Sequence, residues 1–108
     1  MSEAKPIVVF MTAASREEAA RIAQLLVESK LAACVQILPE MQSIYVWKGE
    51  VQRDSEVLLI AKTISSNFAR LEREVRAIHS YETPEIVALP IEHGSQSYLD
   101  WLAASCAS

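Results

Sequence analysis

The succession of strand and helix patterns along the 108-residue chain predicts an α+β fold. Apolar β-branched runs and amphipathic stretches alternate as strand, helix, strand, strand, helix, strand and helix. In order, these patterns cover residues 7–11, 15–29, 34–47, 51–61, 65–78, 85–91 and 97–102. Two βαβ halves joined by a hairpin make a ferredoxin-like βαββαβ sandwich. We therefore expect residues 1–108 to form a single domain of this fold, with a long β-hairpin and a short C-terminal helix.

Two short patterns predict the first strand and the first helix. Residues 7–11 are continuously apolar, which favours a strand that other elements cover. Ser15 followed by Glu18 has the spacing of a capping box, so a helix is expected to begin there. Apolar side chains then recur at helical spacing and should pack on the sheet. These are Ala19, Ile22, Ala23 and Leu26.

Residues 31–63 contain the longest predicted element, a β-hairpin folded about Lys48 and Gly49. Gly49 can adopt the positive φ that a short hairpin turn requires. An arm of about ten residues spans roughly 33 Å. A compact domain as long as this chain has a radius of gyration of only about 13 Å. Because a two-stranded ribbon is marginal in water, we expect its apolar tip, residues 44–47, to pack against neighbouring subunits.

The sequence also predicts the register of this hairpin. Trp47 is expected to lie opposite Glu50. The same register places Leu38 opposite Leu59, so that the two apolar runs meet. Pro39 has no N–H to donate to a ladder, which predicts a bulge or a change of strand at that point.

The second helix is expected to begin at a serine and to end before a proline. Ser65 or Ser66 can supply the cap, and Pro84 disfavours helical geometry at the residue before it. The apolar face of this helix has spacings of three, four and three residues. It consists of Phe68, Leu71, Val75 and Ile78.

The last strand and helix are short. Within residues 85–91, Pro90 predicts that the strand ends there or lies at an edge of the sheet. Ser97 and Asp100 have the spacing that opens a helix. We expect this helix to carry Trp101 as a packing anchor at an interface.

Composition limits the kinds of partner. The formal net charge is −4 and the ten basic residues are scattered, which disfavours nucleic acid. No apolar run approaches the ~18 residues of a membrane span, and the first six residues show no secretory signal, so a cytoplasmic protein is expected.

Two cysteines are too few for a disulfide framework. We expect Cys34 to be a buried apolar residue and Cys106 to be exposed.

Residues 79–85 hold the densest cluster of chemically capable side chains. An imidazole, a phenol and two carboxylates come together there: His79, Tyr81, Glu82 and Glu85. Nitrogen and oxygen donors of this kind can bind Zn²⁺ or Cu²⁺. The structural alternative is that His79 stabilises the C-terminal end of the helix as a cation, while Glu82 bonds amides of the turn.

An enzymatic alternative would use His79 as general acid or base, with Glu82 or Glu85 as its orienting partner. No nucleophile accompanies these residues, and the chain has no GxSxG elbow. Its only glycines, Gly49 and Gly94, are explained by turns, so a phosphate-binding glycine loop is not expected. The sequence therefore predicts a protein that is not an enzyme.

Five segments spread over nearly the whole chain carry a recognisable pattern. They are residues 31–35 (LAACV), 43–49 (SIYVWKG), Glu56 with 62–63 (KT), 79–86 (HSYETPEI) and 98–101 (YLDW). In this order they resemble the CutA family, the divalent-cation tolerance proteins. Several separate motifs in one order make the resemblance specific.

The resemblance implies a very stable homotrimer of ferredoxin-like protomers, similar to the trimer of PII signalling proteins. Its long hairpins would wrap neighbouring subunits, with Tyr45, Trp47 and Trp101 at the interface. The resemblance also implies a cytoplasmic role in tolerance to copper and other divalent metal ions, without an established enzymatic activity. The alternative is a PII-like signalling trimer that binds a small ligand in clefts between subunits.

The copper ligands proposed for other family members are a cysteine at the end of the first strand and two adjacent histidines closing the second helix. The matching positions here hold Met11, Ile78 and His79. We therefore expect weak binding of copper or zinc, with His79, Met11 and Glu82 as ligands. Tyr81 and Glu85 are expected to line a neighbouring ligand cleft.

Overall fold

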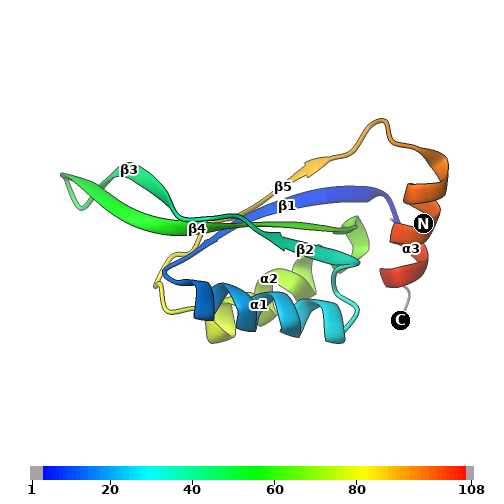
Figure 1. Cartoon of the computed structure of the whole chain (residues 1–108), viewed down its shortest axis with the longest axis horizontal. Coiled ribbons are helices and arrows are strands. Elements are labelled where there is room, and N and C mark those ends of the chain that lie inside the picture. The colour runs from blue at the N-terminus through cyan, green and yellow to red at the C-terminus, as the bar shows by residue number, and fades with distance from the viewer. Residues whose placement is uncertain (1–3, 107–108) are drawn as a thin grey trace.

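The computed structural model describes residues 4–106 and confirms the predicted α+β fold (Figure 1). Its strands and helices, with a short 3₁₀ turn at Ser65–Asn67, follow the predicted order except that one predicted strand is split in two. They are β1 (Pro6–Ala13), α1 (Arg16–Glu28), β2 (Cys34–Ile37), β3 (Met41–Trp47), β4 (Glu50–Ile64), α2 (Phe68–Ile78), β5 (Ile86–Pro90) and α3 (Gln96–Cys106).

The strands form an antiparallel sheet in the order β2-β4-β1-β5. β3 continues the line of β2 and pairs with the outer half of β4. The two halves of the sandwich therefore meet through the central pair β1 and β4, which is the ferredoxin-like arrangement. β5 lies at an edge of the sheet, as Pro90 predicted. β3 and β4 project beyond the body of the protein as a long ribbon (Figure 1).

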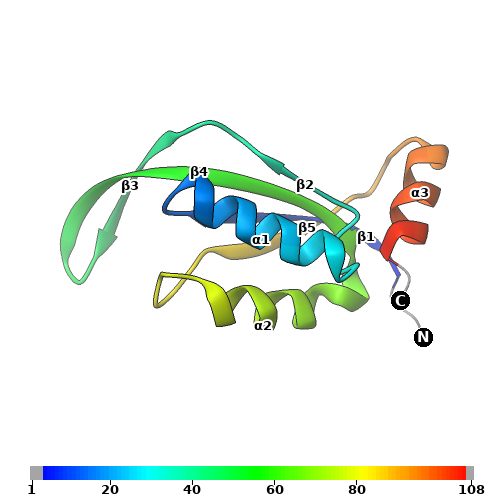
Figure 2. The same cartoon turned by 60° about the horizontal axis from the view of Figure 1, so that its bottom comes forward.

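Helices α1 and α2 lie side by side on one face of the sheet (Figure 2). Successive side chains of a strand point to opposite faces, so alternate residues of β1 and β4 meet the helices. Val9 and Met11 of β1 pair with Ala61 and Leu59 of β4, and all four are fully buried. From the helices, the fully buried apolar residues are Ala19, Ile22, Leu26, Leu71 and Val75.

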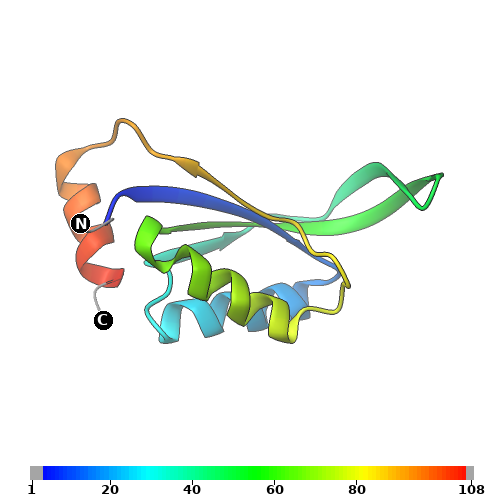
Figure 3. The ribbon, with the colours of Figure 1, turned by 180° about the vertical axis from the view of Figure 1, so that it is seen from behind.

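Neither α1 nor α2 covers the other face of the sheet (Figure 3). The strand pairing puts six apolar side chains on this face, which we call the open face. They are Val8, Phe10, Leu58, Ile60, Val87 and Leu89. Val87 and Leu89, on the edge strand β5, are the most exposed of them.

Helix α3 packs at the end of the sheet away from the ribbon (Figure 3). Ile64, Leu102 and Cys106 form a second, smaller apolar cluster there. The prediction that Cys106 is exposed is wrong, because α3 continues to Cys106 and places its sulfur 3.4 Å from the buried Thr63 hydroxyl. Cys34, predicted to be buried, is half-buried because its register with Lys62 directs it to the open face.

The hairpin confirms the predicted turn and corrects part of the predicted register. Trp47 pairs with Glu50, and Lys48 and Gly49 have φ of +53° and +83°. Positive φ at both central residues is the requirement of a type I′ turn. Beyond the interruption at residues 38–40, however, Leu59 faces Ile37 rather than Leu38. The interruption contains one extra residue relative to β4, which is the bulge that Pro39 predicted.

One of the three predicted helix starts is confirmed. The Ser15 hydroxyl accepts a hydrogen bond from the Glu18 N–H at 3.1 Å and caps α1. Ser65 and Ser66 do not cap α2, whose N-cap is Asn67. The Ser65 N–H still donates to the Lys5 carbonyl at 2.7 Å and prolongs the β1–β4 pairing. At α3 the cap lies two residues earlier than predicted. The Ser95 hydroxyl accepts from the Tyr98 N–H, and Ser97 lies inside the helix.

We predict that the buried hydroxyl of Thr63 stabilises the fold. It donates a hydrogen bond of 2.6 Å to the Leu31 carbonyl and joins the loop after α1 to β4. Thr63→Val keeps the side-chain shape but leaves this carbonyl without its donor, which should lower the free energy of unfolding by about 1–3 kcal/mol. Chemical denaturation at a fixed protein concentration measures the change. Ser66→Ala, which removes an exposed hydroxyl, is the control and should change stability little; equal effects of both variants would contradict the prediction.

Candidate functional site

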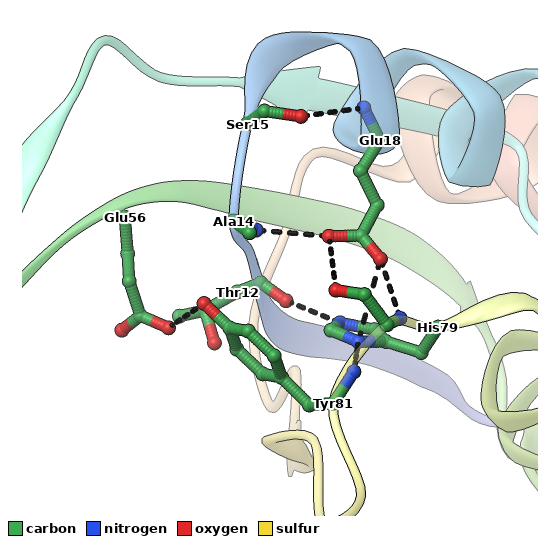
Figure 4. Close-up of polar contacts among 8 residues, drawn as sticks. Thr12, Ala14, Ser15, Glu18, Glu56, His79 and Tyr81 are labelled. Carbon is green, nitrogen blue, oxygen red and sulfur yellow. Dashed lines mark hydrogen bonds and ion pairs between the residues drawn. The ribbon is translucent and has the colours of Figure 1, made fainter.

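The loop that follows α2 folds back toward the first strand and brings His79 into the interior. The imidazole side chain is 0% exposed. Its Nε2 lies 2.8 Å from the Thr12 carbonyl oxygen, and its Nδ1 lies 3.0 Å from the Tyr81 peptide nitrogen (Figure 4). A carbonyl can only accept and a peptide N–H can only donate. His79 is therefore held as the neutral tautomer with its proton on Nε2.

Glu18 joins the beginning of α1 to the same loop. Its Oε1 accepts from the Ala14 N–H at 2.9 Å and its Oε2 accepts from the Ser80 N–H at 2.7 Å (Figure 4). The Ser80 hydroxyl also donates to Oε1, at 3.1 Å. The capping-box pattern indicates that the Glu18 side chain turns back toward the helix start. It contains no signal for Ser80, which is 62 residues away in the chain.

Glu18 is 4% exposed, and its carboxyl group remains ionised. Burial raises the pKa of Glu18, but the hydrogen bonds from Ala14 and from the Ser80 amide and hydroxyl outweigh it, with a smaller electrostatic contribution from the nearby His79 ring. The net result is a pKa below the ordinary value of 4.5. Hydrogen bonds to the charged form of a carboxyl group favour ionisation. Glu18 is therefore a buried anion with most of its hydrogen-bonding capacity used.

Tyr81 extends the loop toward the base of the hairpin. Its hydroxyl donates a hydrogen bond of 2.7 Å to Oε2 of Glu56 on β4 (Figure 4). Burial, followed by the hydrogen bond to Glu56 and by the charge of that carboxylate, raises the pKa of Tyr81 well above its ordinary value. The phenol therefore stays protonated and acts as a donor at physiological pH.

A cleft of about 590 Å³ opens between this loop, the end of β1 and the hairpin. It brings together five of the side chains that the sequence singled out, namely Tyr45, Trp47, Tyr81, Glu82 and Glu85. Sequence reasoning did not assign Thr12 or Glu56 to a site, although both line the cleft. Glu56 was quoted only as part of a motif. On the hairpin, the Tyr45 hydroxyl donates to Asp54, and this hydrogen bond raises the pKa of Tyr45.

The three predicted metal ligands lie in different surroundings. Met11 is fully buried in the core between the sheet and the helices. Both ring nitrogens of His79 are already hydrogen-bonded, whereas Glu82 lines the cleft. Within residues 4–106, no group of three or more His, Cys, Asp and Glu side chains could hold a metal ion. The metal site expected at His79, Met11 and Glu82 therefore stays a prediction, and in the protomer the ring nitrogens of His79 are engaged in hydrogen bonds.

Trp101 lies far from the cleft. It projects from α3, where the centroid of its ring lies 5.4 Å from the centroid of the Tyr98 ring. The hairpin that carries Trp47 occupies the opposite end of the protein (Figure 1). The two exposed tryptophans therefore mark the two ends of an elongated protomer, whose longest dimension is 43 Å.

The fold and the cleft define a small ferredoxin-like α+β protein that is distinguished by a projecting hairpin and by an acidic, aromatic cleft at its base. Residues 7–105 match the model of the family described as CutA1 divalent ion tolerance protein. This match covers nearly the whole chain, and the chain belongs to that family.

Relatives and solved structures agree with this assignment. A divalent-cation tolerance protein CutA from Thermus thermophilus is 54% identical over 95 residues, which are 88% of this chain and 92% of that protein. A chloroplastic CutA protein from Arabidopsis thaliana is 50% identical over 92% of this chain, which spans only 54% of the plant protein. A solved structure of a divalent cation tolerance protein from Thermus thermophilus has a TM-score of 0.92 and 50% identity, covering 94% of this chain and 99% of the other.

In the part of the chain that the structure describes, no helix is both long and apolar enough to cross a membrane. The plant relative is named as chloroplastic. The cytoplasmic location expected from the sequence therefore stays a prediction.

We predict that Glu18 makes the fold sensitive to acid. Because its pKa is lower in the folded state, its contribution to stability is present above the ordinary value of 4.5 and is lost as the pH falls through the folded pKa. Glu18→Gln should lower the free energy of unfolding at pH 7 by about 1–3 kcal/mol. It should also make the loss of stability below pH 4.5 shallower.

Denaturation at a series of pH values measures both effects. Glu17→Gln removes an equal charge from the exposed side of the same helix turn and is the matched control. An acid profile of Glu18→Gln that parallels the wild-type profile would contradict this assignment.

Proposed function

We propose that this protein acts as a homotrimer in tolerance to divalent metal ions, without a metal centre on His79. Membership of the CutA1 family over residues 7–105 is the observation that carries the function, because the family is described as divalent ion tolerance proteins and the Thermus thermophilus relative is named a divalent-cation tolerance protein. The engagement of both His79 ring nitrogens supports the second part of the proposal. It equally supports the view that His79 is not a catalytic base, and the protein is proposed to act by binding rather than by catalysis.

The open face supports the assembly. Neither α1 nor α2 covers its six apolar side chains, and contiguous exposed apolar surface marks a site of association. Exposed aromatic residues also lie at both ends of the protomer, with Tyr45 and Trp47 on the hairpin and Trp101 on α3. In a closed ring, one end of each copy contacts a different surface of the next copy. A trimer with these residues at its interfaces would cover the unsupported hairpin.

A PII-like signalling role is the second candidate. It is favoured by the cleft of about 590 Å³, since small-ligand sites have volumes of about 300–1,000 Å³. Tyr81 and Glu85, the residues predicted for this role, both line the cleft. In this case a bound ligand, rather than a metal ion, would be the signal that the trimer carries.

We predict that a charge on the open face prevents assembly. Val87→Asp places a carboxylate on this face, where burial without a partner costs about 3–5 kcal/mol. At micromolar concentration the mass measured by sedimentation or light scattering should fall from that of three copies to that of one. Val27→Asp, at a similarly exposed valine on α1 (44% compared with 51% exposed), is the control and should leave the mass unchanged. A wild-type protein with the mass of one copy would overturn the proposed trimer.

The proposed function is tested by growth of cells from which the gene has been deleted, in graded concentrations of copper and zinc salts. The deletion should lower the concentration of metal at which growth stops, and the wild-type gene should restore it. Val27→Asp should also restore growth, whereas Val87→Asp should not if the assembled form is the active one. Identical growth of parent and deletion cells at every metal concentration would contradict the proposal.

A further inference from the structure

Glu56 is a buried carboxylate whose hydrogen-bonding capacity is mostly unused. It lies on β4 opposite Met41, at the base of the hairpin, and is 8% exposed. The Tyr81 hydroxyl bonds to Oε2, whereas Oε1 turns away from Tyr81 (Figure 4). Oε1 makes no hydrogen bond or ion pair with any residue that the structure describes. The small accessible part of Glu56 lines the cleft.

A carboxylate in this position attracts a cation. Two carboxylate oxygens can accept about four hydrogen bonds. The free Oε1 is accessible from the cleft, because no buried side-chain oxygen of the described residues lacks a hydrogen-bond partner. The cleft supplies no positive partner, because its lining contains the carboxylates of Glu56, Glu82 and Glu85 and no lysine or arginine. The three negative charges favour a positively charged ligand over a neutral or anionic one.

The other walls of the cleft favour an organic cation over a metal ion. A metal ion needs several donors that converge on one point, and residues 4–106 contain no suitable group of three. The rings of Tyr45, Trp47 and Tyr81 line the cleft instead. Aromatic faces attract ammonium groups and pack against apolar carbon, and the volume of about 590 Å³ is that of a small-molecule site.

We propose that this cleft binds a small organic cation, a protonated amine with an apolar body, whose ammonium group bonds to the free carboxylate oxygen of Glu56. Glu82 and Glu85 add negative charge at the cleft, and the aromatic rings contact the body of the ligand. The site rests on the second candidate function, ligand binding in the cleft. It does not require a role in metal tolerance, and the growth test above can fail while this site remains.

Calorimetric titration of the wild-type protein, in its assembled state, with phenethylammonium tests the proposal. 2-Phenylethanol is the matched neutral probe, because it has nearly the same shape without the charge. We expect saturable binding of the amine, at least about tenfold tighter than binding of the alcohol, since hydrogen bonds between charged groups are the strong ones. This comparison needs no substitution and therefore does not depend on the folding of a variant.

Glu56→Gln tests whether Glu56 is the residue that recognises the positive charge of the amine. It should weaken binding of the amine by about tenfold or more and leave binding of the alcohol unchanged. Glu72→Gln removes an equal charge from the exposed face of α2 and should alter neither. Circular dichroism and sedimentation establish that each variant is folded and assembled before it is titrated.

Three results would overturn the proposal. Equal binding of amine and alcohol would show that the charge is not recognised. Retention of amine affinity in folded Glu56→Gln would exclude the assigned carboxylate. If the amine does not bind while Glu56→Gln disturbs assembly, then Glu56 pairs with a second copy of the chain instead of a ligand.

Discussion

The geometry of the cleft depends on the hydrogen bonds that the buried Glu18 carboxylate accepts. Three successive residues of the loop after α2 each bond a different element: His79 bonds Thr12 of β1, Ser80 bonds Glu18 of α1, and Tyr81 bonds Glu56 of β4. Glu18 occupies the centre of this arrangement, because its charged oxygens form short hydrogen bonds to both the helix start and the loop. Bonds to an ionised group are stronger than those between neutral groups, so they hold Tyr81 at the cleft.

The same network engages the imidazole of His79. A metal-binding histidine needs a free ring nitrogen, with the other nitrogen held by a hydrogen-bond partner. Here the Thr12 carbonyl and the Tyr81 amide use both nitrogens. The side chains that remain available to a ligand lie in the neighbouring cleft. Carboxylates and aromatic rings from the hairpin and the loop line it.

Local patterns predicted most of the fold but not its long-range details. Alternation, helical spacing and the Lys48-Gly49 turn depend on neighbouring residues, and the strands, helices and tight turn followed them. The incorrect predictions concern places where pairing between segments far apart in the chain sets the structure. The extra residue at the bulge shifted the pairing of Ile37 by one, and the pairing of Ser65 with Lys5 delayed the start of α2. The burial of Cys106 likewise depends on where α3 packs.

The sequence by itself determined the order of elements, the hairpin turn, the family and the identity of the cleft residues at positions 81, 82 and 85. Each of these is written in local spacing or in motifs. Only the tertiary structure decided that Met11 faces the core, that both nitrogens of His79 are used and that Glu56 joins the cleft. The physical reason is that the direction and partners of a side chain are set by strand register and by the packing of segments far apart in the chain.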